Sequence, residues 1–342
     1  YLIKDDGRNV VETPGELFRR VARHVAGAEN RFRSAVSATE AEENFYDLMR
    51  ELAFLPNSPT LMNAGTSLGQ LSACFVLPVD DSIDGIFGAL RHMAKIHQSG
   101  GGTGFSFSHL RPKGDLVRTT KGEASGPVSF MSIFDAATGV IVQGGRRRGA
   151  NMGILRCDHP DIMEFIEAKI DRGRFANFNL SVAVTDRFMD AVRRNGAFDL
   201  VNPRTGKRDR TVRARTIFDL IAYGAWRTGD PGLIFTDTVN RRNPTPALGR
   251  IEATNPCGEL PLLPYESCNL GSVNLARMVR DGRPDWERLA RTIRWGVRFL
   301  DDVIEVNNFP LPEIEEITRA NRKIGLGIMG FADMLIRLGI PY

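Results

Sequence analysis

The stretch that decides the fold is residues 73–110, ACFVLPVDDSIDGIFGALRHMAKIHQSGGGTGFSFSHL. It opens with a short apolar run of strand type, continues as a capped helix, and reaches a second strand through a glycine-rich turn. The same order recurs with a helix over 126–144, a strand over 149–157, a helix over 158–170 and a strand over 177–185. This alternation predicts parallel strands joined by crossover helices, which is an α/β fold.

The segment before this stretch has a different periodicity. Residues 12–54 repeat apolar positions at helical spacing. Thr13 is placed as an N-cap, with Pro14 at the first helical position and Glu16 at the capping-box position. The sequence therefore predicts a helical region ahead of the α/β region.

Three segments complete the pattern on the C-terminal side. Residues 196–214 hold two strand-like runs around a Thr-Gly pair, which predicts an inserted surface β-hairpin. Residues 284–307 and 313–338 are each predicted to form an amphipathic helix.

Composition restricts the class of protein. An apolar content of 42% with 25% charged residues is ordinary for a globular chain of 342 residues. No run approaches ~20 apolar residues and no secretory signal is recognisable, so we expect a cytoplasmic protein with no membrane partner. The net charge of +4 and the short arginine runs favour local phosphate sites over a nucleic-acid groove. The four cysteines form no CxxC pair, so no metal site is predicted.

One short segment carries reactive side chains on irregular backbone. In NPCGE, residues 255–259, Pro256 and Gly258 exclude regular helix and strand. If the loop is extended, alternation directs Asn255, Cys257 and Glu259 the same way. A thiol, a carboxylate and an amide facing one substrate form a catalytic arrangement. A tight turn around a buried cysteine fits the same residues equally well.

The wider pattern resembles ribonucleotide reductase. NxCxE is followed by Cys268 in SCNLGSVNLA and preceded by Cys74 in LSACFVLPVDDS. The likeness continues in GGTGFSFSHLRPKGD, TKGEASGPVSFM, QGGRRRGANMGILRCDHPDI and RKIGLGIMGFADML. These sequence segments are most similar to those of the adenosylcobalamin-dependent (class II) branch, and class I catalytic subunits share the same core.

The resemblance implies a fold. The family has a ten-stranded α/β barrel made of two half-barrels, with a finger loop that carries a radical cysteine into the centre. We accordingly expect an N-terminal helical region over 1–70. Residues 71–342 would hold the first half-barrel, a finger loop at about 250–262, the sixth strand and the following helices. The remainder of the barrel would lie outside this chain.

The resemblance also implies roles for five residues. Cys257 matches the cysteine that becomes a thiyl radical and abstracts the 3′-hydrogen of the substrate. Glu259 matches the base for the 3′-hydroxyl proton, and Asn255 matches the amide that holds the ribose hydroxyls. Cys74 and Cys268 match the dithiol that supplies reducing equivalents, so their Cα atoms should come within ~7 Å.

Further residues are implied for substrate and effector. Ser58, in LPNSPT, matches a phosphate-binding segment, although an ordinary Ser-Pro turn fits equally well, and Ala73 and Gly102 match substrate-lining positions. Asp81 matches an effector contact, although it could simply cap the next helix. Two glycine-flanked loops match the specificity loops that contact a deoxynucleoside triphosphate, through Arg118, Lys121, Arg146 and Arg147. The arginine run alone is typical of a solvated loop.

From the resemblance we expect a ribonucleoside-diphosphate reductase that reduces ribonucleotides with non-covalently bound adenosylcobalamin. We expect dNTP or ATP effectors to regulate its specificity. A thioredoxin or glutaredoxin-type reductant and a homodimer are expected partners. The alternatives are a class I large subunit with a partner-generated radical, and a non-catalytic nucleotide-binding regulatory module. Cys157 and the five histidines are interpreted as structural.

Overall fold

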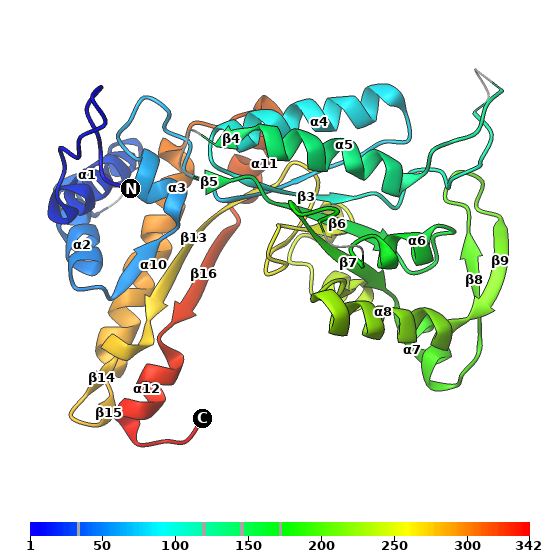
Figure 1. The fold of residues 1–342 in the computed structure, drawn as a ribbon. Coiled ribbons are helices and arrows are strands. Elements are labelled where there is room, and N and C mark those ends of the chain that lie inside the picture. Colours follow the sequence, from blue (N-terminus) through cyan, green and yellow to red (C-terminus); the bar gives the residue numbers. More distant parts are fainter. Residues whose placement is uncertain (33–34, 118–120, 144–146, 171–172) are drawn as a thin grey trace. The chain divides into compact units, whose positions relative to one another are not determined.

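The computed structural model describes residues 1–342 apart from 33–34, 118–120, 144–146 and 171–172 (Figure 1). The chain divides into two compact units. Unit one comprises Tyr1–Ala73 and Ser267–Tyr342, and unit two comprises Cys74–Glu266. Unit one thus joins the predicted helical region to the C-terminal segment of the chain.

Unit two is built on a parallel sheet. Its strands lie in the order β2-β3-β6-β7-β10, and each neighbouring pair is parallel. The bounds are β2 Cys74–Leu77, β3 Gly102–Ser106, β6 Asn151–Arg156, β7 Phe178–Val184 and β10 Gly232–Phe235. The predicted α/β fold is confirmed. The sequence reasoning had not identified β10, which forms the end of this run of parallel strands.

Helices connect these strands as crossovers. Helices α4 and α5 run side by side along the sheet in Figure 1. The helices of unit two are α4 Ile83–Gln98, α5 Pro127–Val140, α6 Ile162–Glu167, α7 Asp186–Arg193, α8 Ala214–Thr228, α9 Thr236–Arg241 and the 3₁₀ helix η2 Pro246–Leu248. Helix α4 begins at Ser82, whose hydroxyl accepts a hydrogen bond from the Gly85 amide at 3.0 Å. Ser82 therefore caps this helix, and the alternative that Asp81 does so is wrong.

Short antiparallel pairs complete unit two. They are β4 Val142–Gln143 with β5 Arg147–Arg148, β8 Ala197–Val201 with β9 Arg208–Arg213, and β11 Ala253–Thr254 with β12 Pro261–Leu262. The predicted hairpin is confirmed as β8 and β9, and Gly206 takes a φ of 66° in its turn.

Unit one holds a small sheet covered by helices. Strand β13 pairs with β1 in antiparallel and with β16 in parallel orientation. The strands are β1 Phe54–Pro56, β13 Ser267–Asn274 and β16 Ile324–Met329, with the hairpin β14 Val279–Arg280 and β15 Arg283–Pro284. The helices are α1 Pro14–Ala26, α2 Ala38–Arg50, α3 Ser58–Asn63, α10 Trp286–Val306, α11 Pro312–Asn321 and α12 Phe331–Leu338, with 3₁₀ helices η1 Gly27–Arg31 and η3 Leu275–Arg277.

The start of α1 agrees with the sequence prediction. Thr13 accepts a hydrogen bond from the Glu16 amide, and the Glu16 carboxylate accepts one from the Thr13 amide at 2.8 Å. Pro14 occupies the first turn, where its missing N–H costs nothing. Both orphan donors are satisfied, so the predicted capping box is confirmed.

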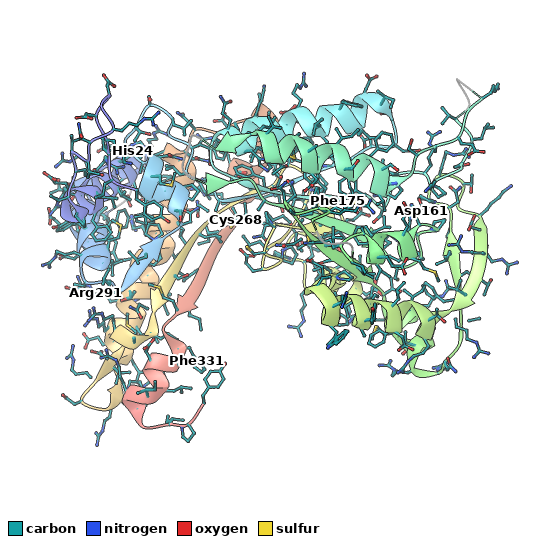
Figure 2. The ribbon with its side chains drawn as sticks, in the orientation of Figure 1. His24, Asp161, Phe175, Cys268, Arg291 and Phe331 are labelled. Atoms are coloured by element: carbon teal, nitrogen blue, oxygen red, sulfur yellow. The ribbon has the colours of Figure 1, made fainter. Side chains whose placement is uncertain are left out.

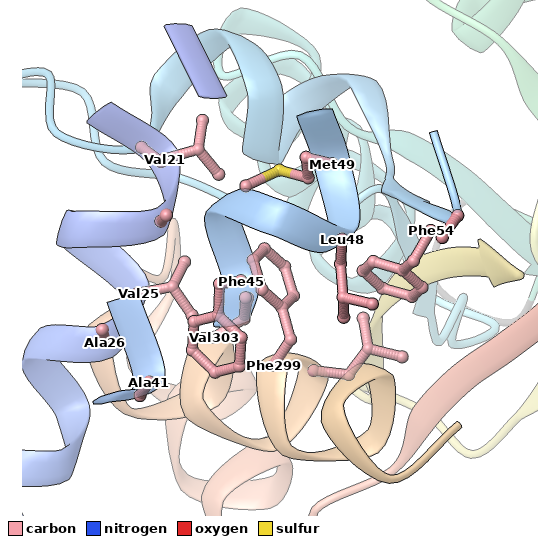
Figure 3. Packing of buried hydrophobic residues seen from close by; sticks show 14 of the residues in the cluster. Val21, Val25, Ala26, Ala41, Phe45, Leu48, Met49, Phe54, Phe299 and Val303 are labelled. Carbon is pink, nitrogen blue, oxygen red and sulfur yellow. The ribbon is translucent and has the colours of Figure 1, made fainter. Parts of the chain in front are cut away.

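The core of unit one joins the N-terminal helices to α10. Phe45 of α2 and Phe299 of α10 meet edge to face, with ring centroids 5.0 Å apart (Figure 3). Phe54 packs against Phe299 at 5.5 Å, and Val303 extends the same buried cluster. Aromatic pairs of this geometry add to the apolar area that each ring buries.

The prediction of one helix over 313–338 is wrong. Helix α11 ends at Asn321, and Arg322 takes the left-handed conformation with a φ of 51°. The chain then forms β16, which pairs with β13 along six residues, before α12 begins. Gly325 and Gly327 weaken a helix, and the missing side chain at Gly325 permits close approach to Leu270.

Among the residues that the structure describes, no helix combines the length and apolarity that crossing a membrane requires.

Candidate active site

A tight turn places Cys257 at its tip. The Gly258 amide donates to the Asn255 carbonyl at 3.1 Å, which closes a four-residue turn with Pro256 and Cys257 at the central positions. Proline presets the backbone for the first central position of such a turn. Gly258 takes a φ of 84°, which explains the glycine at this point.

Further bonds fix this turn at its base. The Leu260 amide donates to Asn255 Oδ1 at 2.9 Å, and the Asn255 amide donates to the Leu260 carbonyl at 3.2 Å. Ala253 and Leu262 pair across β11 and β12. The loop over 253–262 is therefore a closed structure with its own hydrogen-bond ladder.

The turn changes the predicted side-chain directions. Because the backbone over 255–258 is not extended, side chains do not alternate along it. Asn255, Cys257 and Glu259 therefore differ in how far they are exposed to solvent. Cys257 and Glu259 are exposed, whereas Asn255 is fully buried. The alternative of a turn around a buried cysteine is right about the turn and wrong about the burial.

Asn255 connects the turn to the first strand of the parallel sheet. Its Nδ2 donates to Sγ of Cys74 at 3.1 Å, and Cys74 is the buried first residue of β2. Strand β11 contacts β2, β3 and β6, so the loop lies against the sheet. Of the five residues implied by the resemblance, Asn255, Cys257 and Glu259 thus share one loop, and Asn255 links that loop to Cys74.

Glycines in β3 make room for this loop. A Cβ on Gly104 would lie 1.6 Å from the Thr254 carbonyl oxygen, and one on Gly102 would lie 2.7 Å from Cγ of Pro256. Because they carry no side chain, Gly102 and Gly104 permit close approach of the chain's own loop to β3.

The stem of the loop carries an ion pair that sequence reasoning missed. Nε2 of His109, which follows β3, donates to the Glu252 carboxylate at 2.6 Å. This hydrogen bond raises the pKa of His109 and lowers the pKa of Glu252. Both side chains are partly exposed, so the pair contributes only modestly to stability.

Cys268 lies in unit one. It is the second residue of β13, is 1% exposed, and is marked in Figure 2. The carbonyl of Cys268 accepts a hydrogen bond from the Ala73 amide at 3.1 Å within this unit. The predicted approach of Cys74 to Cys268 stays a prediction.

Cys157 is a packed thiol, as interpreted from the sequence. It is 0% exposed, and burial raises its pKa to about 12. A thiol that is protonated and inaccessible is a poor nucleophile.

The histidines were also interpreted as structural. His97 is 0% exposed, and burial lowers its pKa to about 4, so the ring is neutral. Its Nε2 lies 3.0 Å from the Thr103 hydroxyl of β3, which in turn donates to Asn151 of β6 at 2.6 Å. His97 thereby ties α4 to the parallel sheet.

The implied substrate residues belong to both units. Ser58 begins α3 in unit one and is half-buried, and its hydroxyl lies 2.9 Å from that of Tyr1. Ala73 is half-buried in the same unit. Gly102 lies in unit two against Pro256. Their contacts with a nucleotide stay predictions.

Asp81 lines a cavity of about 680 Å³ in unit two. It accepts from Nε of Arg111 at 2.9 Å, so the two charges offset each other at the cavity wall. Arg204, from the turn of the β8–β9 hairpin, also lines the cavity and pairs with Asp115 at 2.7 Å. The hydrogen bonds from Arg204 hold the pKa of Asp115 well below its usual range.

Of the remaining effector predictions, Arg118 and Lys121 lie in the sequence between the cavity-lining residues Val117 and Glu123, whereas Arg146 and Arg147 lie further along the chain. Lys121 is exposed, with a φ of 60°, in the loop that the Leu116–Glu123 bridge closes. Arg118 and Arg146 lie outside the described residues, and Arg147 lies in β5. Sequence reasoning missed Arg111 and Arg204. The first stands a few residues beyond a strand end and the second in a hairpin turn, where functional side chains often gather.

The fold and the loop define an α/β protein that presents a thiol from a loop lying against its parallel sheet. A family model described as ribonucleotide reductase, barrel domain, matches residues 72–342, and a model described as ribonucleotide reductase, all-alpha domain, matches residues 1–69. The chain therefore belongs to the ribonucleotide reductase large-chain family.

Individual relatives agree with this family. A vitamin B12-dependent ribonucleoside-diphosphate reductase of Mycobacterium tuberculosis (strain CDC 1551 / Oshkosh) is 57% identical over 100% of this chain and 49% of its own length. A protein of the same name from Thermoplasma acidophilum is 52% identical over 100% of this chain and 52% of its own length. The ribonucleoside-diphosphate reductase large subunit of Vaccinia virus (strain Copenhagen) is 32% identical over 100% of this chain and 47% of its own length. The chain spans about half the length of these relatives.

Proposed function

We propose that the protein containing this chain reduces ribonucleotides to 2′-deoxyribonucleotides through a thiyl radical on Cys257. The observation that carries the proposal is the turn over 255–258, which presents Cys257 to the exterior of the loop. Glu259 is exposed two residues later. A thiol with a nearby carboxylate suits abstraction of a hydrogen atom beside a hydroxyl that must lose its proton.

The proposed steps balance in atoms and electrons. The Cys257 thiyl takes the hydrogen atom from C3′ of the ribose, and Glu259 accepts the 3′-hydroxyl proton. The 2′-hydroxyl leaves as water with a proton from one thiol of the Cys74–Cys268 pair, and C2′ takes a hydrogen atom from the other thiol. These two thiols supply two electrons and become a disulfide. Cys257 finally returns a hydrogen atom to C3′, and the proton on Glu259 completes the product.

The buried residues support two of these roles. Asn255 holds the Cys74 sulfur at 3.1 Å, so the first reducing thiol is tied to the loop that bears the radical thiol. The amide of Ala73, the residue before Cys74, bonds to the carbonyl of Cys268. Asn255 is itself fully buried, so the ribose contact implied by the resemblance requires its second Nδ2 hydrogen or the free lone pair of its oxygen to face the substrate.

The cobalamin-dependent branch fits this chain better than its alternative. Two relatives that match the whole chain at 57% and 52% identity are named vitamin B12-dependent, whereas the viral large subunit is 32% identical. When bound, adenosylcobalamin would supply the radical. An exposed Cys257 fits an external radical source, because a thiol buried in the loop could not meet one.

We further propose that the cavity at Asp81 and Arg111 receives a deoxynucleoside triphosphate or ATP effector. Its volume of about 680 Å³ lies within the range of small-molecule sites. Asp81 can accept from a ribose hydroxyl, and the arginine-bearing loops can supply phosphate contacts. A homodimer and a thioredoxin or glutaredoxin-type reductant complete the proposal. The division into regions 1–70 and 71–342 belongs to it as well, supported by the two family matches.

A regulatory module without activity would need the cavity but not the cysteines. The bond between Asn255 and Cys74 and the exposure of Cys257 are features of a reaction site, so they favour the enzyme.

The test uses the full-length protein with adenosylcobalamin, a dithiol and ribonucleotide substrates. Cys257→Ser should form no deoxyribonucleotide, because a serine O–H bond is too strong to serve as a reversible radical carrier. Cys157→Ala is the matched control, since that thiol is buried and protonated, and it should retain turnover. Deoxyribonucleotide formation by Cys257→Ser at the wild-type rate would refute the proposal.

A further inference from the structure

Asn179 breaks the burial pattern of its strand. Of the seven residues of β7, six are buried and Asn179 alone is exposed. At the exposed position of the strand this polar side chain is available to bond to a neighbouring segment. Its Nδ2 donates to the carbonyl oxygen of Pro256 at 2.7 Å.

The bonded carbonyl belongs to the peptide unit that leads into Cys257. Because a peptide unit is planar, the direction of the Pro256 carbonyl also fixes the direction of the Cys257 amide. The bond therefore restrains the rotation of the turn directly before the thiol. Asn179 is 77 positions away in sequence, so this restraint comes from the sheet and not from the loop itself.

The glycines of β3 restrain the same segment in a different way. Backbone at Gly104 lies against Thr254, and backbone at Gly102 lies against Pro256. These contacts limit how far the loop can approach β3, but packing against glycine is not directional. The hydrogen bond from Asn179 supplies the missing direction, since a short N–H···O bond requires near-linear geometry.

We propose that Asn179 is a positioning residue for the Cys257 thiol: it orients the Pro256–Cys257 peptide so that the thiol occupies its reactive place. This inference rests on the proposed function for its catalytic consequence. Its structural part, the ordering of the turn, stands on the bond to Pro256 alone. Asn179 acts through Cys257 and is given no contact with substrate.

The neighbouring Asn177 provides a matched control. It too uses Nδ2 to donate to a backbone carbonyl, that of Asp135, at 3.1 Å. The carbonyl of Asp135 belongs to α5 and not to the cysteine loop. Asn177→Ala and Asn179→Ala therefore remove the same kind of bond two residues apart, and only the second should affect the turn.

The experiment compares both variants in the full-length protein by amide hydrogen exchange and by steady-state kinetics. Asn179→Ala should speed exchange at the amides of Gly258 and Leu260 by about 5- to 10-fold, the loss expected for one hydrogen bond. It should lower kcat by a similar factor with KM within about twofold, because the Cys257 thiol loses its orientation while the substrate contacts remain. Asn177→Ala should change neither quantity.

A second variant protects the test against misfolding. Asn179→Asp keeps the size of the side chain but replaces the donor with an oxygen that repels the Pro256 carbonyl, so it should slow turnover at least as much. Unchanged exchange at Gly258 and Leu260 in both Asn179 variants would overturn the inference, as would an equal loss in Asn177→Ala. If the wild-type protein reduced no ribonucleotide, the proposed function would fail, and the exchange comparison would still decide the role of Asn179.

Discussion

Gly104→Ala is the substitution whose effect can be worked out most directly from the structure. The new Cβ would lie 1.6 Å from the Thr254 carbonyl oxygen, and the contacting atom is backbone. Side-chain carbons essentially never approach within 3.0 Å of such an atom, so the loop must move by at least about 1.4 Å or β3 must bend. No rotamer change can relieve the contact, because alanine has none to make.

Two magnitudes follow from this displacement. Overpacking of this kind costs about 1–3 kcal/mol of stability. A shift of ~1 Å in a reacting group can cost about 100-fold in rate. Because Thr254 stands three residues before Cys257, we expect kcat to fall about 100-fold while the protein remains folded.

Turnover and thermal unfolding of the full-length protein measure the two effects. Gly139→Ala is the matched control, because its Cβ would meet its nearest neighbour, Nδ2 of Asn177, at an ordinary 3.5 Å. Gly139 lies within α5, so alanine there should be neutral or stabilise the helix by less than about 1 kcal/mol. Wild-type turnover in Gly104→Ala would refute the inference that β3 seats the loop.

Three further predictions concern other parts of the chain. Asp302 is 1% exposed, and burial, followed by the charge of Glu29, raises its pKa to about 8. An acid whose pKa is raised in the folded state makes the protein less stable as the pH rises from the pKa of the unfolded chain to that of the folded one. The unfolding temperature of the wild type should therefore decrease as the pH rises from about 4 to about 8. Asp302→Asn should flatten that profile; an unchanged slope would contradict the assignment. Arg111→Ala removes the partner of Asp81 and should weaken deoxynucleoside-triphosphate binding about tenfold by equilibrium titration, the cost of a charged hydrogen bond, whereas equal affinity would exclude the cavity as the effector site. Cys74→Ser should abolish dithiol-supported turnover, measured as deoxyribonucleotide formed, and turnover at the wild-type rate would exclude Cys74 from the reducing pair.

Local signals in the sequence were sufficient for much of the fold. The capping box of Thr13 and Glu16 acts within four residues, so the sequence alone could predict it. The alternation from Cys74 onward likewise predicted the parallel sheet, because the period of apolar residues depends on short segments.

The segment after Asn321 could not be predicted in the same way. Its apolar residues fit a helix, but β16 forms because β13, more than 50 residues earlier in the chain, offers an edge to pair with. Pairing between distant segments overrides local propensity, and no window around Gly325 contains that information.

In the candidate site, too, features that depend on neighbouring residues could be predicted, whereas contacts between distant segments could not. Pro256 and Gly258 predicted irregular backbone around Cys257, and the structure has a turn there. The expected alternation of side chains failed because the Gly258 amide bonds to the Asn255 carbonyl and closes a turn. The Asn255 side chain is therefore buried, whereas Cys257 and Glu259 are exposed. The contact between Asn179 and Pro256 spans 77 positions, so only the folded chain shows it.

The central claim is that Cys257 is a radical site, and hydrogen exchange between cofactor and solvent tests it most directly. In the full-length protein with adenosylcobalamin, reversible formation of a thiyl should exchange the 5′-hydrogens of the cofactor with water, since thiol hydrogens exchange freely. The measurement is the loss of tritium from 5′-labelled cofactor into solvent. Cys257→Ser should abolish this exchange, while Cys74→Ser and Glu259→Gln should preserve it, because neither residue carries the radical. Exchange at the wild-type rate in Cys257→Ser would contradict the account.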